Sequence, residues 1–335
     1  MAFLRFFAQR LLYLLLQLLG VVTITFFLVH LLPGNPAQAL AGQGASPAAV
    51  KAISHQLGFD KPLPQQYVIY VNNVLHGEFG NSIYTGQTVL KDLQQRIPAT
   101  LELVTLSMLI GVVVGIPLGI YSGLKQRGVI SRIVFFYGML TGAVPDFWLA
   151  LILVFVLFFV LGWAPPPFGR LGVLTPPPHV TGFYLIDSVL SGQWDVLVSV
   201  LKYLALPTIT LVFVYMGNVV KQARSSVEEV SQSEFIEYAR ACGLSERVVL
   251  RYMLRNALAP VVTVIAITYG FLLGGAVLVE TVFSWGGLGQ YAVQSITNSD
   301  YAPITGFVLV AALFMALMYL VVDVLYAVLD PRIQY

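Results

Sequence analysis

The stretch EFIEYARACGLSERVVLRYMLRNALAP, residues 234–260, decides how this chain folds, because it is polar and charged yet lies between two long apolar runs. Acidic and basic residues alternate up to Glu246, a pattern typical of a water-exposed helix. Gly243 interrupts the pattern and favours a turn or a helix C-cap. Apolar residues then recur at helical spacing from Val248 to Met253. The stretch predicts a helix–glycine–helix hairpin that packs on its own membrane domain or fills a groove on a partner.

The composition places the chain in a membrane. Hydrophobic residues make up 58% of its 335 residues, charged residues make up only 10%, and the mean hydropathy is +0.82. A soluble domain carries about 25% charged residues, so there is too little charge here to cover a water-soluble body. The single cysteine, Cys242, excludes an internal disulfide, and the four histidines are scattered without ligand spacing. We therefore expect no metal site.

Six apolar stretches are long enough to cross a bilayer. They are predicted at residues 11–32, 99–121, 133–163, 203–220, 257–279 and 304–325. The third is too long for one straight crossing, so Pro145 is expected to kink it. The polar segment 38–96 predicts a small extramembrane subdomain with a helix at Pro47–Leu57. Close helix packing is predicted where glycines lie four apart, at Gly111, Gly115 and Gly119.

Six spans place both termini on one side of the membrane, and the distribution of positive charge identifies that side as the cytoplasm. The N-terminus, residues 122–132, residues 221–256 and the tail together hold 12 of the 18 lysines and arginines. The hairpin and both termini are therefore predicted to be cytoplasmic. Residues 38–98 and the loop 280–303 are predicted to lie on the opposite side.

Acidic residues within the spans are few, and intramembrane acids are functional candidates because they are costly to bury. Asp146 follows Pro145 and lies about 20 Å from the cytoplasmic end at about 1.5 Å per residue. It is the candidate for lining a translocation path and meeting a substrate amine; the alternative is an acid bonded to a neighbouring helix or facing a partner subunit. Asp323 is expected to be structural, Glu102 is expected to be solvated near the outer border, and Glu280 lies at a span border.

The hairpin carries a recognisable motif. Glu237-Tyr238-Ala239, followed after three residues by Gly243, resembles the EAA motif of ABC importer permeases, although Tyr238 replaces a small residue and Arg255-Asn256 stands where many families have Leu-Pro. Other stretches resemble the B-type permease of dipeptide and oligopeptide importers, namely HLLPGNP at 30–36, LGFDKPLPQQYVIYVNNVLHGEFGNSI at 57–83, ETVFSWGGLGQ at 280–290 and DPRI at 330–333. The chain is identified as a member of this family over nearly its whole length.

The resemblance implies an all-α integral membrane protein with the type I ABC importer fold. It implies an N-terminal transmembrane helix with an extracytoplasmic insertion at 1–95, a five-helix permease domain at 96–329 and a cytoplasmic tail at 330–335. The implied role is a multi-pass permease of a bacterial inner membrane that carries dipeptides or oligopeptides. Residues implied to couple the permease to an ATPase are Glu237, Tyr238, Ala239, Gly243, Leu244, Val249 and Met253.

The resemblance also implies partners. These are a second homologous permease, two ATP-binding subunits and an extracytoplasmic substrate-binding protein, assembled in a lipid bilayer without nucleic acid. The sequence contains no GxxxxGK[ST] phosphate-binding motif. The chain is therefore not expected to be an enzyme, and no cofactor is expected in it, because ATP and magnesium would be held by the ATP-binding subunits.

Other functions remain open at this point. The same machine could import another solute, such as nickel or an oligosaccharide, because the binding protein largely selects the cargo. A stand-alone secondary transporter or channel would be expected to show inverted repeats or paired intramembrane charges, and the sequence shows neither. A membrane enzyme would need a nucleophile–base or metal constellation, which the spacing of serines, histidines and acids does not provide.

Overall fold

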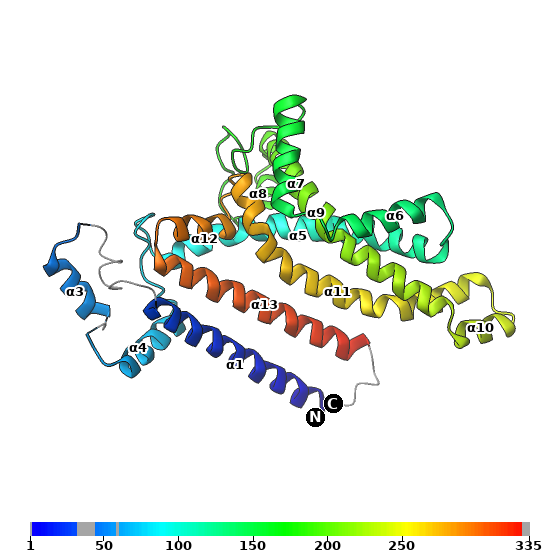
Figure 1. The fold of residues 1–335 in the computed structure, drawn as a ribbon, viewed down its shortest axis with the longest axis horizontal. Coiled ribbons are helices and arrows are strands. Elements are labelled where there is room, and N and C mark those ends of the chain that lie inside the picture. Colours follow the sequence, from blue (N-terminus) through cyan, green and yellow to red (C-terminus); the bar gives the residue numbers. More distant parts are fainter. Residues whose placement is uncertain (1, 32–43, 58–59, 330–335) are drawn as a thin grey trace.

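The computed structural model describes residues 2–31, 44–57 and 60–329. Regular structure in this part of the chain is helical, apart from one antiparallel bridge between Asn81 and Thr88. The helices, shown in Figure 1, are α1 (Ala2–Leu31), α3 (Pro47–Leu57), α4 (Leu63–Leu75), α5 (Val89–Leu124), α6 (Val129–Leu140), α7 (Asp146–Leu153), the π-helix η1 (Val154–Val160), α8 (Tyr184–Leu190), α9 (Trp194–Ser231), α10 (Glu234–Ala241), α11 (Glu246–Val282), α12 (Leu288–Thr297) and α13 (Tyr301–Leu329). The predicted all-α class is confirmed. The tail 330–335, with its DPRI sequence, and most of 30–36 lie outside the described residues.

The third predicted span is not a single helix. Among the described residues, the helices long and apolar enough to cross a membrane are α1, α5, α9, α11 and α13. Residues 133–163 are divided between α6 and the α7–η1 pair, which are separated by a turn at 141–145. Pro145 has extended dihedral angles, φ −64° and ψ 138°, and a proline disfavours helix in the residue before it. The expectation of one helix kinked at Pro145 is therefore wrong, because α6 ends at Leu140 and α7 begins at Asp146. The count of six spans is not confirmed.

Two of the long helices extend far beyond the predicted spans. α9 has 38 residues and α11 has 37. At about 1.5 Å per residue each is about 55 Å long, whereas the hydrocarbon core of a bilayer is about 30 Å thick. Much of the extra length adjoins the hairpin, since α9 continues to Ser231 and α11 begins at Glu246. The second arm of the hairpin is thus continuous with a membrane helix.

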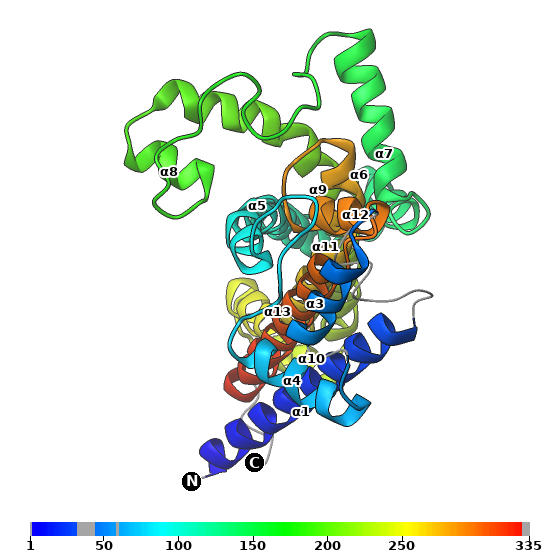
Figure 2. The ribbon, with the colours of Figure 1, turned by 90° about the vertical axis from the view of Figure 1, so that its left-hand side faces the viewer.

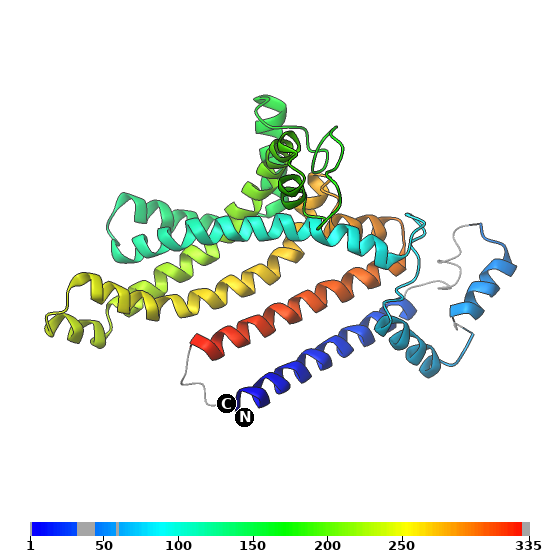
Figure 3. The same ribbon diagram turned by 180° about the vertical axis from the view of Figure 1, so that it is seen from behind.

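The start of the first helix and the end of the last helix lie toward the same end of the described structure. α1 packs along α13, and Nε of Arg10 lies 3.2 Å from Oδ2 of Asp323. Figure 3 shows the start of α1, the end of α13 and the α10 hairpin directed toward one end, with α3, α4 and α12 toward the other. Asp323 thus has the structural role expected of it.

The insertion after the first span contains α3 and α4, and α3 has the bounds predicted from sequence. Figures 1 and 2 show α4 beside the end of α1, with α3 farther out. The hydroxyls of Tyr67 and Thr23 are 2.7 Å apart, and those of Tyr70 and Thr25 are 3.2 Å apart. The ring of Phe26 packs against both tyrosine rings. These contacts join α4 to α1.

Small residues allow α5 and α9 to pack closely, as the glycine spacing predicted. A Cβ atom added to Gly119 would lie 2.6 Å from the Cβ of Ala223 and 2.8 Å from the carbonyl oxygen of Val220. A Cβ on Gly115 would lie 2.9 Å from the side chain of Met216. Glycine at these positions lets the two backbones approach, which is how membrane helices gain packing energy without a hydrophobic driving force.

Replacing Gly119 by leucine should destabilise the protein by about 1–3 kcal/mol, the usual cost of overpacking, because the backbone of α9 would have to move. Gly20→Leu is the matched control, since Gly20 also lies in a long apolar helix and a Cβ there meets no atom within 4 Å. Thermal melting of the purified proteins in detergent measures the difference. Equal melting temperatures for the two variants would contradict the packing described.

Candidate functional site

The hairpin has its own small hydrophobic core. The backbone N–H of Gly243 donates to the carbonyl of Arg240, and that of Leu244 donates to the carbonyl of Ala239. This pattern is a Schellman C-cap, and Gly243 takes the left-handed conformation, φ +73°, that the cap requires. Below the turn, α10 and α11 pack on Val227 of α9. The predicted helix–glycine–helix hairpin is confirmed.

The structure divides the predicted coupling residues into two groups. Residues buried in the hairpin core are Ala239, Val249 and Met253. Residues exposed at its surface are Glu237, Tyr238, Gly243 and Leu244. Only the exposed group is available to contact a partner, whereas the buried group holds the hairpin in shape. The coupling role of both groups stays a prediction.

The hairpin exposes further apolar side chains: the sequence placed Tyr252 on an apolar helix face, but it did not mark Phe235. Phe235 is 44% exposed and Tyr252 is 47% exposed, alongside Tyr238 at 72%. The residues facing the hairpin core are Ile236 and Ala239 on α10 and Val249, Met253 and Ala257 on α11. Once those residues and Leu254, which packs against them, are assigned inward, Phe235 and Tyr252 are left on the outer faces. The exposed residues could therefore have been identified from the sequence by setting aside the apolar positions that face the hairpin core.

Asp146 lies where three helices meet. It is the first residue of α7, it is half-buried, and its Oδ1 accepts a hydrogen bond of 2.7 Å from the N–H of Phe147. The hydroxyl of Tyr215 on α9 donates to its Oδ2 at 3.4 Å. A Cβ on Gly275 of α11 would lie 1.6 Å from that tyrosine oxygen, so glycine is required there. One carboxylate oxygen is thus only weakly bonded and remains able to accept a hydrogen bond.

The expectation that Glu102 is solvated is wrong. Its side chain is 3% exposed and forms an ion pair with Arg170, whose side chain is 8% exposed. The second carboxylate oxygen accepts a hydrogen bond of 2.7 Å from the N–H of Leu185, at the start of α8. The guanidinium carbon of Arg170 lies 3.5 Å from the ring centre of Tyr184. The pair attaches the loop between η1 and α8 to α5.

The segment 280–290 is folded around Glu280, which is fully buried. Its carboxylate accepts hydrogen bonds from the hydroxyl of Thr100 at 2.5 Å and from the N–H groups of Gly289 at 2.8 Å and Gln290 at 3.1 Å. The indole N–H of Trp285 donates to the carbonyl of Ala99 at 2.9 Å. The segment therefore holds α11 and α12 against α5, and these residues serve packing.

Asp187 organises the loop before α8. Its carboxylate accepts hydrogen bonds from the N–H groups of Thr181 at 2.8 Å and Gly182 at 2.9 Å and from the hydroxyl of Thr181 at 2.7 Å. Burial raises the pKa of this carboxyl, but the bonds from Thr181, Gly182 and Val180 outweigh burial and leave the pKa below its usual value.

A lowered pKa in the folded state stabilises the fold above the unfolded-state pKa of about 3.9. That stabilisation is lost as the pH falls through the folded-state pKa of Asp187. We expect Asp187→Asn to melt below the parent protein at pH 7 and the gap to narrow below about pH 4. Melting curves across this pH range check the prediction, and a gap independent of pH would contradict it.

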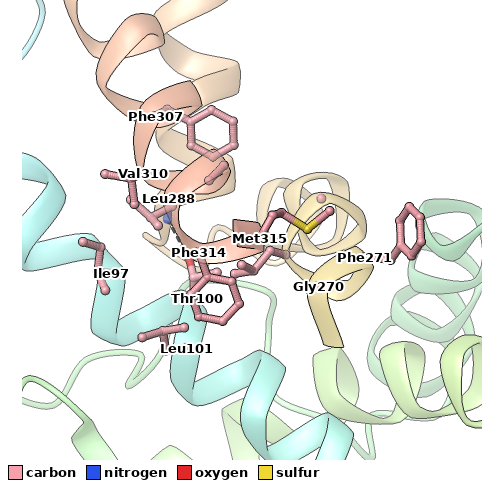
Figure 4. A pocket seen from close by; sticks show the side chains of 13 residues that line it. Ile97, Thr100, Leu101, Gly270, Phe271, Leu288, Phe307, Val310, Phe314 and Met315 are labelled. Atoms are coloured by element: carbon pink, nitrogen blue, oxygen red, sulfur yellow. Dashed lines mark hydrogen bonds between the residues drawn. The ribbon is translucent and has the colours of Figure 1, made fainter. Parts of the chain in front are cut away.

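An apolar cavity of about 180 Å³ lies between α5, α11, α12 and α13. Figure 4 shows the side chains of Ile97, Phe314 and Met315 around it. Its polar lining residue, Thr100, already bonds Glu280. Such walls suit an apolar chain rather than a charged solute.

The long apolar helices, the polar hairpin at one end and the helical insertion at the other define a multi-pass membrane protein of the permease class. The family model described as binding-protein-dependent transport system inner membrane component matches residues 115–335, and its N-terminal companion matches residues 3–104. The chain therefore belongs to this family of transport permeases, and the resemblance seen in its motifs is confirmed.

Curated relatives match from end to end. The probable D,D-dipeptide transport system permease protein DdpB of Escherichia coli is 44% identical over 99% of this chain and 98% of its own length. The dipeptide transport system permease protein DppB of Alkalihalophilus pseudofirmus is 38% identical, with 98% of each chain covered. The di/tripeptide transport system permease protein DppB of Pseudomonas aeruginosa is 37% identical, with 99% of each covered.

Proposed function

We propose that this chain is a permease subunit of an ATP-driven importer of dipeptides and that it forms the translocation path together with a second, homologous permease. The observation that carries the proposal is its likeness over 98–99% of their length to permeases named for dipeptide and tripeptide transport. Because the likeness covers the insertion and the hairpin as well as the spans, it supports the whole assembly rather than the membrane fold alone.

Two ATP-binding subunits are proposed to bind the hairpin on the cytoplasmic side, where both termini would also lie. Exposed Tyr238 supports this most directly, since a few residues, often tyrosine, supply most of the binding energy at an interface, and exposed Phe235 and Leu244 enlarge the apolar surface around it. ATP and magnesium would be bound by those subunits. A soluble substrate-binding protein would dock at the opposite end, on α3, α4 and α12.

Asp146 is proposed to bind the α-ammonium group of the dipeptide. The support is its half-buried carboxylate, one oxygen of which has only the 3.4 Å contact with Tyr215. A carboxylate hydrogen-bonded to an ammonium group gains about 1.5–3 kcal/mol, which corresponds to roughly a tenfold change in affinity or more.

Neutralising this group as Asp146→Asn should therefore lower uptake of dipeptides about tenfold or more. Tyr215→Phe, which removes only the weak hydrogen bond, should have a small effect. Uptake of a labelled dipeptide in competition with free and N-acetylated dipeptides measures the selectivity. Unchanged uptake by Asp146→Asn would remove Asp146 from the path.

The proposed function is tested by reconstitution in lipid vesicles. The chain alone should transport nothing. Together with the second permease, the ATP-binding subunits, the binding protein and ATP, it should accumulate a labelled dipeptide, and D,D- and L,L-dialanine should be compared. Flux through the chain alone would contradict the proposal, and accumulation of another solute in place of either dipeptide would contradict the proposed cargo.

A further inference from the structure

A second hollow differs in character from the apolar cavity of Figure 4. It is a groove of about 460 Å³ between α9 and α11. α9 contributes Asn218, Lys221, Gln222 and Ser225, and α11 contributes Thr268 with apolar neighbours. One helix wall of this groove is thus entirely polar, although it continues a membrane-spanning helix.

The polar wall follows one face of α9. Tyr215, Asn218, Gln222 and Ser225 are separated by three, four and three residues, the spacing that places side chains on one face of a helix. Tyr215 is the residue whose hydroxyl contacts Asp146. The polar face therefore begins at the proposed ammonium-binding group and continues along α9 toward the hairpin.

The polar side chains on this face have few hydrogen-bond partners within the described part of the chain. Asn218, Lys221 and Ser225 are exposed, and within the described residues none of the three has a hydrogen-bond partner. Gln222 bonds only Ser226, at 2.9 Å. Asn218 lies within the predicted span 203–220, where exposing its amide to lipid would cost several kcal/mol. Lys221, Gln222 and Ser225 follow it at the cytoplasmic end of α9. This face must therefore meet water or polar groups of another chain.

We infer that the polar face of α9 from Asn218 to Ser225 lines the water-filled inner half of the translocation path, through which a zwitterionic peptide leaves Asp146 for the cytoplasm. The inference rests on the proposed function. Water is the occupant that the groove fits, because its α9 wall offers four polar side chains as hydrogen-bond partners and its volume exceeds the about 10–15 Å³ that one water needs. Lys221, at the edge of the face, keeps its ammonium group hydrated in such a path.

Cysteine accessibility tests the inference directly, because Cys242 is the single native cysteine. In a Cys242→Ser background, Asn218→Cys, Gln222→Cys and Ser225→Cys are placed in the complete transporter in inside-out vesicles. The probe is a membrane-impermeant trimethylammonium methanethiosulfonate. Leu317→Cys on α13 is the control, since Leu317 is 42% exposed on an apolar helix.

The three α9 cysteines should react at least tenfold faster than the control, and a saturating dipeptide should slow the reaction. Reaction rates equal to that of the control would overturn the inference. Reaction of the three cysteines in the isolated chain but not in the complete transporter would also overturn it, because the face would then be a permease–permease interface. Dipeptide uptake by the unlabelled background transporter reports separately on the proposed cargo. If Cys242→Ser impairs assembly, mass spectrometry of labelled peptides gives the same rates with Cys242 retained.

Discussion

Gly243→Val should reduce ATP-driven uptake at least tenfold and weaken copurification of the ATP-binding subunits. Gly243 has φ +73°, and a left-handed conformation costs an L-residue about 1–2 kcal/mol. Valine, being β-branched, would abandon the Schellman cap rather than adopt this conformation. The direction of α10 relative to α11 would then change, and with it the exposed surface around Tyr238 and Leu244.

The control for this variant introduces the same backbone strain at a different glycine, outside the hairpin. Gly192, in the turn between α8 and α9, has φ +68°, and like Gly243 it has no atom within 4 Å of an added Cβ. Gly192→Val should retain most uptake, because no partner is proposed at that turn. Uptake and copurification that survive Gly243→Val, or that fall equally in both variants, would contradict a coupling role for the hairpin.

Arg170→Met should be the most destabilising single change among those considered. It would leave the carboxylate of Glu102 buried with one backbone N–H, that of Leu185, as its remaining hydrogen-bond donor among the described residues. Removing one partner of a buried ion pair costs about 3–5 kcal/mol. We expect a large fall in melting temperature in detergent and early proteolysis of the loop between η1 and α8.

Two controls separate the buried charge from other effects. The double variant Glu102→Gln with Arg170→Met leaves no unpaired charge and should recover much of the lost stability. Arg240→Met removes an exposed ion pair, in which the Nε of Arg240 lies 3.1 Å from Glu246, and should cost less than about 1 kcal/mol. A double variant no more stable than Arg170→Met would show that the arginine acts through packing on Tyr184.

Local features of the fold were predictable from the sequence. The helical class follows from long apolar runs, and the hairpin follows from amphipathic spacing on either side of Gly243. The bounds of α3 and the close helix packing at Gly119 were also predictable from the sequence. Each of these depends on residues within a few turns of one another.

Other features depend on contacts between distant residues. Glu102 and Arg170 are 68 positions apart, and nothing local marks either as buried. The break at Pro145 was expected as a kink, because a proline inside an apolar run either kinks or ends a helix and its position in the sequence does not distinguish the two. In the same way, burial of Val249 and exposure of Tyr238 emerge only when α10 folds back on α11.

The sequence by itself determined that this is a helical membrane protein with a glycine-hinged polar hairpin, because hydrophobicity and helical periodicity are properties of contiguous residues. Only the tertiary structure decided which acids are buried and paired, which hairpin side chains remain exposed, and that the polar face of α9 opens onto a groove beside α11. The reason is physical: burial and charge pairing arise when helices distant in sequence pack together, and no single helix carries that information.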